Sequence, residues 1–460
     1  MKLFSLFIFM LSNVALYAQS MTANLNSAVR KMELDSQFEH ALIGLYVVNN
    51  NTGAVVFEKN GQIGMAPASS QKIITSASAF ELLGADYRYR TTINFKGTTA
   101  GTYLVVKGAG DPTFGSWRWE GTVSKYIFLS VAEGLKLKGI NKLKGTILFT
   151  NNNWETQATP RGWTWEDMGN YYGAGARAFN WNENQYTLTL QPGKKVGEEV
   201  TILNMAPAPG SAFSLKNELK TGAAGSGDQS IIYAAEGSEA GHVRGTVPAG
   251  VASFKIKGSM PSPHQFFAVA LKNNLMENGI VWDEGSLEST PSNFSNTQIL
   301  TEVVSPSLDS MNYWFMQESI NLYGEAFVKT IALKQKNVAA ADTGLAIIRY
   351  FWSTRGIPTS ALNILDGSGL SPANRVTPAA LVKVLVYAVG RPWYKHFYEA
   401  LPAMNGIKMK SGYIGGVRSY TGYVKSKSGE TYSFAFIINN FDGSPGAVRE
   451  KMYKLLDLLK

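Results

Sequence analysis

The stretch Pro67-Ala68-Ser69-Ser70-Gln71-Lys72, with the helical pattern that follows it as far as Gly84, decides how this chain is organised. A proline near a helix start and a glycine just beyond a helix end are favoured positions, so we predict a turn followed by an amphipathic helix. Ser69 and Lys72 lie three positions apart and share one face of such a helix, within hydrogen-bonding reach. A hydroxyl beside an amine is the minimum for an activated serine nucleophile. The alternative is a serine at a helix start beside a solvated lysine, because chance places roughly one or two Ser-x-x-Lys motifs in a chain this long.

Residues 1–18 have the pattern of a cleavable secretory signal peptide. One lysine is followed by a short apolar run, and the segment closes with Ala15-Leu16-Tyr17-Ala18 before Gln19. We expect cleavage near Ala18, with an uncleaved anchor as the alternative. The apolar run is short for a membrane span, so we expect no transmembrane segment after cleavage.

The composition indicates a globular protein of two or three domains, since 45% of the 460 residues are apolar and 17% are charged. The chain has no cysteine, which excludes disulfides, thiol chemistry and cysteine-based metal sites. Its four histidines include no His-x-x-x-His pair, so we expect neither a metal nor a cofactor. The net charge of +9 comes without a dense basic cluster, which favours an anionic polymer over nucleic acid as a partner.

The two ends of the chain predict one discontinuous domain. Residues 41–48 and 54–59 predict a hairpin before the Ser69 helix, and residues 417–424 and 431–439 predict another near the C-terminus. Helical periodicity occupies four segments before the second hairpin, at residues 307–316, 322–334, 340–353 and 378–389. We expect the domain to comprise residues 19–84 and 292–460, split by an insertion.

The insertion, residues 85–291, is rich in strand-like runs, which helical patterns interrupt at 125–137 and 265–278. Between residues 206 and 250 the composition is loop-like and rich in Gly, Ala, Ser and Pro, with a single strand at 231–235. We therefore expect one or two inserted domains of mixed α and β content, with two nested domains favoured.

The C-terminal helix carries an apolar stripe with helical spacing, formed by Val448, Met452, Leu455, Leu456 and Leu459. Such a stripe can lie weakly on a membrane surface, or it can pack on the sheet of its own domain.

Two further motifs follow in the C-terminal part. Ser319-Ile320-Asn321 lies between two helical patterns, and Lys410-Ser411-Gly412 precedes the terminal hairpin. A second triplet, Lys427-Ser428-Gly429, falls in the turn of the hairpin. The chemistry needs a lysine on a strand edge that offers backbone N–H groups to a substrate, so we choose the triplet of Lys410. The order Ser-x-x-Lys, Ser-x-Asn, Lys-Ser-Gly is the signature of penicillin-recognising acyl-serine enzymes.

With these motifs the chain resembles the class C low-molecular-mass penicillin-binding proteins, the D-alanyl-D-alanine carboxypeptidase/endopeptidase family. The long interval between Ser69 and Ser319 is typical of that family, and the likeness extends from about residue 41 to the C-terminus. Four accessory stretches also match: Gly108-Ala109-Gly110-Asp111-Pro112-Thr113, Trp163-Thr164-Trp165-Glu166-Asp167, Tyr172-Gly173-Ala174 and Asp366-Gly367-Ser368-Gly369-Leu370-Ser371. The resemblance implies an α/β (α+β) fold, a penicillin-binding-protein/β-lactamase-like transpeptidase domain split by a large insertion. It also implies a periplasmic enzyme that acts on peptidoglycan stem peptides and binds β-lactams.

The resemblance also implies catalytic roles. Ser69 attacks the carbonyl of the penultimate D-Ala, Lys72 acts as the base, and Ser319 relays a proton to the leaving nitrogen. Asn321 hydrogen-bonds the substrate amide and Lys72. A lysine needs its pKa lowered from about 10.4 to act as a base, and Lys410 is the candidate second cation that would help to lower it.

The same resemblance implies a substrate-binding set: Ser411, Gly412, Tyr413 and Asp167. Lys410 and Ser411 would hold the terminal carboxylate, and the backbone N–H groups of Ser69 and Tyr413 would form the oxyanion hole. Asp167 could meet an amino group of the stem peptide, or it could cap a helix start. Asp366 and Ser368 are expected to shape a Gly-rich turn.

Three sequence positions differ from the common family pattern. Ser411 stands where threonine is commoner, Ile320 where aspartate is common, and Pro372 where many relatives carry an arginine. The last difference leaves open how a stem-peptide side chain is recognised, although Arg375 is close in sequence. A β-lactamase or esterase on the same fold, and a non-catalytic wall-binding module, are the alternative functions.

Overall fold

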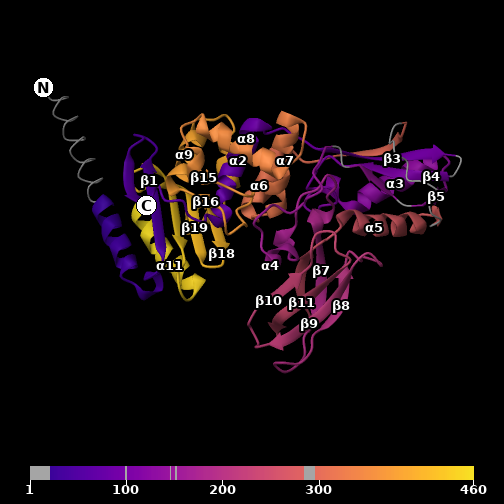
Figure 1. Cartoon of the computed structure of the whole chain (residues 1–460), viewed down its shortest axis with the longest axis horizontal. Coiled ribbons are helices and arrows are strands. Elements are labelled where there is room, and N and C mark those ends of the chain that lie inside the picture. The colour runs from indigo at the N-terminus through magenta and orange to yellow at the C-terminus, as the bar shows by residue number, and fades with distance from the viewer. Residues whose placement is uncertain (1–20, 99–100, 146, 151–152, 284–295) are drawn as a thin grey trace. The chain divides into compact units, whose positions relative to one another are not determined.

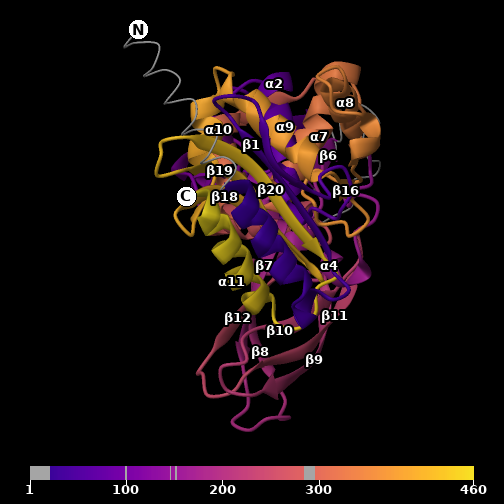
Figure 2. The same cartoon turned by 90° about the vertical axis from the view of Figure 1, so that its left-hand side faces the viewer.

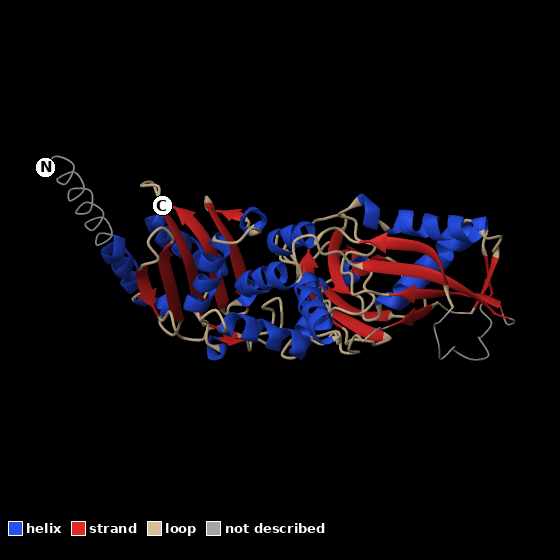
Figure 3. Ribbon diagram, turned by 90° about the horizontal axis from the view of Figure 1, so that it is seen from above, coloured by secondary structure: helices blue, strands red, loops and turns tan. Residues whose placement is uncertain are grey.

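The computed structural model describes residues 21–98, 101–145, 147–150, 153–283 and 296–460, so the predicted signal peptide lies outside the described residues. The chain packs as two compact units. Unit 1 comprises the residues up to Leu82 together with Asn312–Ser319 and Leu345–Lys460, and unit 2 comprises Leu83–Met311 and Ile320–Gly344. Our domain limits stay a prediction, since packing units need not coincide with domains. Both units combine helices and strands (Figure 3), as the predicted fold class requires.

Unit 1 is built on a six-stranded antiparallel sheet in the order β17-β18-β19-β20-β1-β2. Its strands are β1 (Leu42–Asn49), β2 (Val55–Lys59), β17 (Ala403–Met404), β18 (Ile407–Ile414), β19 (Val417–Lys425) and β20 (Thr431–Asn439). Both predicted hairpins are therefore confirmed. β1 pairs with β20 from Leu42 opposite Asn439 to Asn49 opposite Tyr432, which joins the two ends of the chain in one sheet (Figure 2).

Helices cover both faces of this sheet. On one face, α11 (Pro445–Leu456) and a helix spanning residues 21–33 share an apolar core with the strands. On the other, α9 (Pro378–Val389) packs on β1 and β20, and Pro378 approaches Gly44 so closely that a β-carbon there would lie 3.0 Å from it. The remaining elements of unit 1 are α2 (Lys72–Leu82), α10 (Tyr394–Ala400), β15 (Leu362–Asn363), β16 (Arg375–Val376) and parts of α6 (Leu308–Gln317) and α8 (Ala341–Ser353).

The apolar stripe of the C-terminal helix is buried against the sheet of its own unit. Val448, Met452, Leu456 and Leu459 each have 0% exposure and belong to the same core as β1 and β20. The apolar face of the helix, which a contact with a membrane surface would require, is therefore buried within the protein. Among the described residues, none of the helices is long and apolar enough to span a bilayer.

Unit 2 contains several small sheets and the long helices α3 (Ser124–Leu137), α5 (Pro263–Glu277) and α7 (Asn321–Lys336). The sheet orders are β14-β3-β4-β6, β12-β7-β8, β10-β11-β9 and β13-β5. Its other elements are β3 (Arg90–Thr98), β4 (Gly101–Lys107), β5 (Lys142–Lys144), β6 (Leu148–Thr150), α4 (Trp165–Met168), β7 (Gln185–Gln191), β8 (Thr201–Ala206), β9 (Ser214–Gly222), β10 (Gln229–Tyr233), β11 (Ala240–Pro248), β12 (Phe254–Ser259), β13 (Val281–Asp283) and β14 (Gln298–Val304) (Figure 1). Its core surrounds Phe267, whose ring contacts those of Phe114, Phe128, Phe149, Phe179 and Trp181.

The loop-like interpretation of residues 206–250 is wrong, because β9 and β11 lie there and pair in parallel. Their buried apolar residues recur at every fourth position, Leu215 (partly buried) and Leu219 in one strand and Val243 and Val247 in the other. Glycine and polar residues fill the positions between them. The two-residue alternation that marks a half-buried strand is therefore hidden in this region.

Replacing Met452 by Ala tests the packing of the C-terminal helix. A fully buried methionine that loses its side chain costs about 2–5 kcal/mol of unfolding free energy. Lys454→Ala, on the exposed face of the same helix, is the matched control and should change the free energy by less than about 0.5 kcal/mol. Equal effects of the two substitutions in denaturant unfolding would contradict this packing.

Candidate active site

Ser69 lies on a short 3-10 turn, η2 (Ala68–Gln71), and α2 begins only at Lys72. The sequence predicted a turn followed by one helix. The structure differs in that Ser69 lies in a 3-10 helix, which is wound more tightly than an α-helix. Side chains at i and i+3 nearly eclipse in a 3-10 helix, so the spacing brings the two groups together. Lys72 Nζ donates a hydrogen bond of 3.0 Å to Ser69 Oγ. At its far end α2 stops at Leu82, and Gly84 has a φ of 95° as a C-terminal cap requires.

Lys72 is completely buried, with 0% of its surface exposed. Besides Ser69, its ammonium group donates to the carbonyl oxygen of Ser368 at 2.7 Å and lies 5.6 Å from the ring centroid of Phe315. A buried lysine needs such acceptors, because water no longer solvates it. The amine is thus held in one position beside the serine hydroxyl.

Asp366 organises the loop that supplies this carbonyl. Its carboxylate accepts from the backbone N–H groups of Gly369 (2.8 Å) and Ser371 (2.6 Å) and from Asn374 Nδ2 (2.9 Å). Gln71, next to Lys72, donates to both the carbonyl and the carboxylate of Asp366. The turn-shaping role expected for Asp366 is therefore what the structure shows.

Sequence reasoning missed the carbonyl of Ser368 as a partner of Lys72. The glycines on both sides of Ser368 were the available signal. Gly369 has a φ of 83°, and a β-carbon there would lie 2.0 Å from the carbonyl oxygen of Ala68, so only glycine lets the loop reach the serine turn.

The serine turn is tethered to the Lys410 strand through its second serine. Ser70 Oγ lies 2.8 Å from Ser419 Oγ on β19 and donates weakly, at 3.4 Å, to the carbonyl oxygen of Lys410 on β18. Ser419 in turn donates to the carbonyl oxygen of Pro67 at 2.6 Å. The first and third motifs therefore meet in unit 1, joined by a residue that sequence reasoning did not select.

Lys410 is 2% exposed, and burial lowers the pKa of its amine to about 7 from an ordinary value of 10.5. Nζ donates to the carbonyl oxygen of Ser411 at 3.1 Å. With a pKa near 7 this lysine carries only part of a charge at neutral pH, so the second cation expected from the sequence titrates within the physiological range. Ser411 is half-buried, whereas Tyr413 is 52% exposed and lies under the guanidinium group of Arg418.

Ser319 is also part of unit 1 and connects α6 to α7. Its φ of 58° is in the left-handed region, which costs a non-glycine residue about 1–2 kcal/mol. Helix α6 is fixed to α2 because Ser76 Oγ donates to Asn312 Oδ1 at 2.6 Å. Phe315, one helical turn before Ser319, is the ring that faces Lys72. Ser319, with its strained backbone, thus comes directly after α6, a helix that is fixed beside Lys72.

Asn321 belongs to unit 2, where it is the first residue of α7 and 6% exposed. Its Nδ2 donates to the carbonyl oxygen of Tyr172 at 2.8 Å.

Asp167 also belongs to unit 2 and lies half-buried in α4, three residues after the N-cap Thr164. Burial raises the pKa of Asp167, while hydrogen bonds from the hydroxyl and backbone of Thr164, and from Tyr172, oppose the rise. The bonds to Thr164 match the helix-start alternative that we gave for Asp167.

Gly412→Ala tests the close approach of β18 to the serine turn. A β-carbon at Gly412 would lie 2.3 Å from Ser419 Oγ and 2.7 Å from the carbonyl oxygen of Pro67. We expect a loss of about 1–3 kcal/mol in unfolding free energy. Gly415→Ala is the control, because no atom lies within 4 Å of the added carbon. An unchanged Gly412→Ala stability would overturn this account of the packing.

Comparisons with known proteins identify the family of this chain. The model of the D-Ala-D-Ala carboxypeptidase 3 (S13) family matches residues 25–459. The D-alanyl-D-alanine carboxypeptidase of Actinomadura sp. (strain R39) is 27% identical over 458 residues, which cover 90% of this chain and 81% of that protein. D-alanyl-D-alanine carboxypeptidase DacB of Haemophilus influenzae is 22% identical over 440 residues, covering 88% of this chain and 86% of the relative.

Among solved structures, penicillin binding protein 4 (dacB) from Haemophilus influenzae superposes with a TM-score of 0.74 at 20% identity, covering 92% of this chain and 94% of the other. This likeness confirms the predicted penicillin-binding-protein fold. The family match over nearly the whole chain confirms the resemblance carried by the three motifs: the protein belongs to the D-Ala-D-Ala carboxypeptidase 3 (S13) family and is a serine-type D-Ala-D-Ala peptidase.

Proposed function

We propose that the protein is an exported, periplasmic enzyme that hydrolyses D-Ala-D-Ala termini, D-Ala cross-links, or both, in peptidoglycan stem peptides. The chemistry proceeds through an acyl-enzyme on Ser69. The observation that carries the proposal is the 3.0 Å hydrogen bond from the fully buried Lys72 to Ser69 Oγ.

Acylation begins when Ser69 Oγ attacks the carbonyl carbon of the penultimate D-Ala and its proton passes to Lys72. Collapse of the tetrahedral intermediate breaks the C–N bond, and the proton that Lys72 took from Ser69 passes through the Ser319 hydroxyl to the leaving amine, which returns Lys72 to its neutral form. Water then hydrolyses the ester and regenerates the serine. The backbone N–H groups of Ser69 and Tyr413 are proposed to stabilise the oxyanion.

Substrate recognition is assigned to the third motif and to two residues of unit 2. Lys410 and Ser411 bind the terminal carboxylate, a charge-assisted contact that suits a carboxypeptidase. Gly412 allows the strand to approach the serine turn, and Asn321 hydrogen-bonds the substrate amide. Asp167 meets an amino group of the stem peptide when its local bonds to Thr164 are exchanged.

β-Lactams are proposed as acylating inhibitors of this chain. Penicillin binding protein 4 of Haemophilus influenzae has been solved in complex with a β-lactam, and that structure superposes on this chain with a TM-score of 0.71 at 20% identity. A β-lactam presents a strained amide to the same serine and a carboxylate to the same lysine.

Labelling with a fluorescent penicillin tests the nucleophile. We expect the wild type to take up the label covalently and Ser69→Ala to take up none, because the ester bond forms on Ser69 Oγ. Ser428→Ala, the serine of the Lys-Ser-Gly triplet in the hairpin turn, is the control and should be labelled like the wild type. Labelling of Ser69→Ala, or a wild type that stays unlabelled, would refute the proposal; label that disappears within seconds would indicate a β-lactamase.

The pKa of Lys410 predicts that kcat/KM depends on pH differently for substrates with a terminal carboxylate and for substrates with a neutral terminus. The charged amine predominates below about pH 7 and is lost as the pH rises through this value. We expect kcat/KM for a peptide ending in a free D-Ala carboxylate to fall above pH 7, by at most about tenfold per pH unit, relative to the same peptide with an amidated terminus. The ratio of the two rates is measured from about pH 6 to 9, and a ratio independent of pH would rule out this role for Lys410.

A further inference from the structure

Asn321 is oriented by the main chain of the insertion. Its Nδ2 donates to the carbonyl oxygen of Tyr172 at 2.8 Å. A flipped side-chain amide would place Oδ1 against that carbonyl, and two acceptors without a proton between them repel. The position of the Tyr172 carbonyl therefore decides which end of the Asn321 amide is directed away from it.

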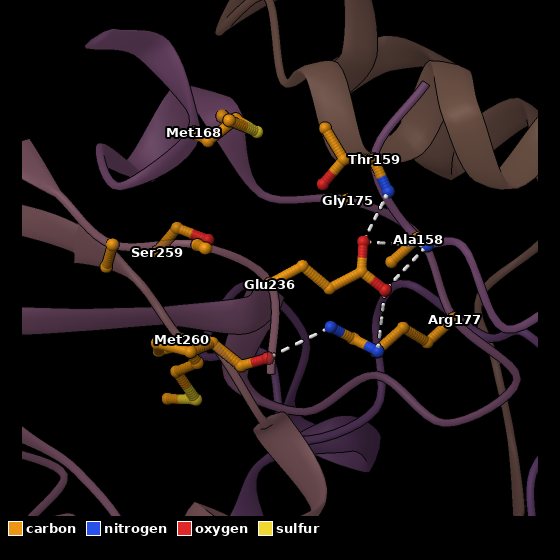
Figure 4. Close-up of a pocket in the computed structure, with 12 residues that line it drawn as sticks. Ala158, Thr159, Met168, Gly175, Arg177, Glu236, Ser259 and Met260 are labelled. Atoms are coloured by element: carbon orange, nitrogen blue, oxygen red, sulfur yellow. Dashed lines mark hydrogen bonds and ion pairs between the residues drawn. The ribbon is translucent and has the colours of Figure 1, made fainter. Parts of the chain in front are cut away.

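Tyr172 lies within residues 158–177, which we term the anchored loop. The loop begins and ends on one carboxylate, that of Glu236 (Figure 4). The backbone N–H groups of Ala158 and Thr159 donate to Glu236 at 2.8 and 3.0 Å, and Arg177 forms an ion pair with it at 3.2 Å. One side chain thus holds both ends of the loop.

Asn170 fixes the middle of the anchored loop. Its Oδ1 accepts from the backbone N–H of Ile232 in β10 at 3.1 Å, and its Nδ2 donates to the carbonyl oxygen of Glu166 at 2.6 Å. Asn170 is 6% exposed and its main chain pairs with Gly258. Its own carbonyl accepts from the N–H of Gly173, which closes the turn that contains Tyr172.

Two glycines leave the turn no room to shift. A β-carbon at Gly169 would lie 2.1 Å from the carbonyl oxygen of Ile232, and one at Gly173 would lie 2.0 Å from that of Asp167. The turn is therefore pressed against β10 on one side and against α4 on the other.

We propose that Asn170 is a positioning residue for the reaction: it holds the Tyr172 carbonyl where this oxygen sets the orientation of the Asn321 amide. The insertion then contributes to catalysis through the alignment of a motif residue, in addition to any contact of Asp167 with substrate. This inference rests on the proposed role of Asn321 in binding the scissile amide.

The test compares the rates of acylation by a fluorescent penicillin in Asn170→Ala and in the wild type. Misplacing a group that aligns substrate lowers rates by up to about 100-fold, so we expect a decrease of about 10- to 100-fold. Asn94→Ala is the matched control. Asn94 is also a buried asparagine of unit 2 (1% exposed) that bonds main-chain oxygens, but it lies in β3, and its replacement should leave the rate unchanged within about twofold even if stability falls.

A double-mutant cycle with Asn321→Ala distinguishes positioning from a general loss of structure. If Asn170 acts through Asn321, Asn170→Ala has no further effect once Asn321 is removed, whereas a merely structural role gives rate losses that multiply. A crystal structure of Asn170→Ala provides a second readout, in which we expect Asn321 Nδ2 to leave the carbonyl of residue 172.

Full penicillin reactivity of Asn170→Ala, multiplying losses in the cycle, or an unmoved Asn321 in the crystal structure would each overturn the inference. A wild type that takes up no penicillin would instead refute the proposed function itself.

Discussion

The candidate active site depends on keeping the amine of Lys72 buried and directed at the hydroxyl of Ser69. An amine without water needs acceptors, and Ser69 Oγ and the carbonyl of Ser368 are two of them. Each of these belongs to a segment that other contacts fix. The loop of Ser368 is organised by Asp366, and the turn of Ser69 is tethered through Ser70 to Ser419 on β19 and to the Lys410 carbonyl on β18. The geometry of the hydrogen bond from Lys72 to Ser69 therefore depends on three segments that are distant in sequence: the serine turn, the loop of Ser368 and the Lys410 strand.

Backbone strain accompanies this arrangement. Ala68 and Ser319 both have positive φ values, 46° and 58°, although neither is glycine. Such conformations persist only where the surrounding packing over-determines them, and they concentrate at functional sites. Ala68 is fully buried between Gly369 and Gly412, two positions where a β-carbon would collide with it. Close packing around the serine turn thus stabilises Ala68, the strained residue just before Ser69.

Local sequence signals predicted the elements that carry the motifs. The hairpins of unit 1 and the end of α2 just before Gly84 follow from short-range periodicity and turn residues, and the structure has them. Lys410 is assigned to a strand because the second Lys-Ser-Gly triplet falls in a hairpin turn, and it lies in β18. The contacts that fix the motifs could not be predicted in this way. Ser70 meets Ser419, and Lys72 meets the carbonyl of Ser368, across intervals that no local pattern spans. Strands β9 and β11 were missed because their apolar residues recur at every fourth position.

The second motif is divided between the two packing units, because the boundary falls between Ser319 and Ile320. Ser319 belongs to the same unit as Ser69, whereas Asn321 belongs to unit 2 and bonds to the main chain of the anchored loop. A motif of three residues looks like one local feature in the sequence, yet its serine packs within unit 1 and its asparagine within unit 2. In our proposal, packing within unit 2 therefore affects the reaction through the orientation of the Asn321 side-chain amide.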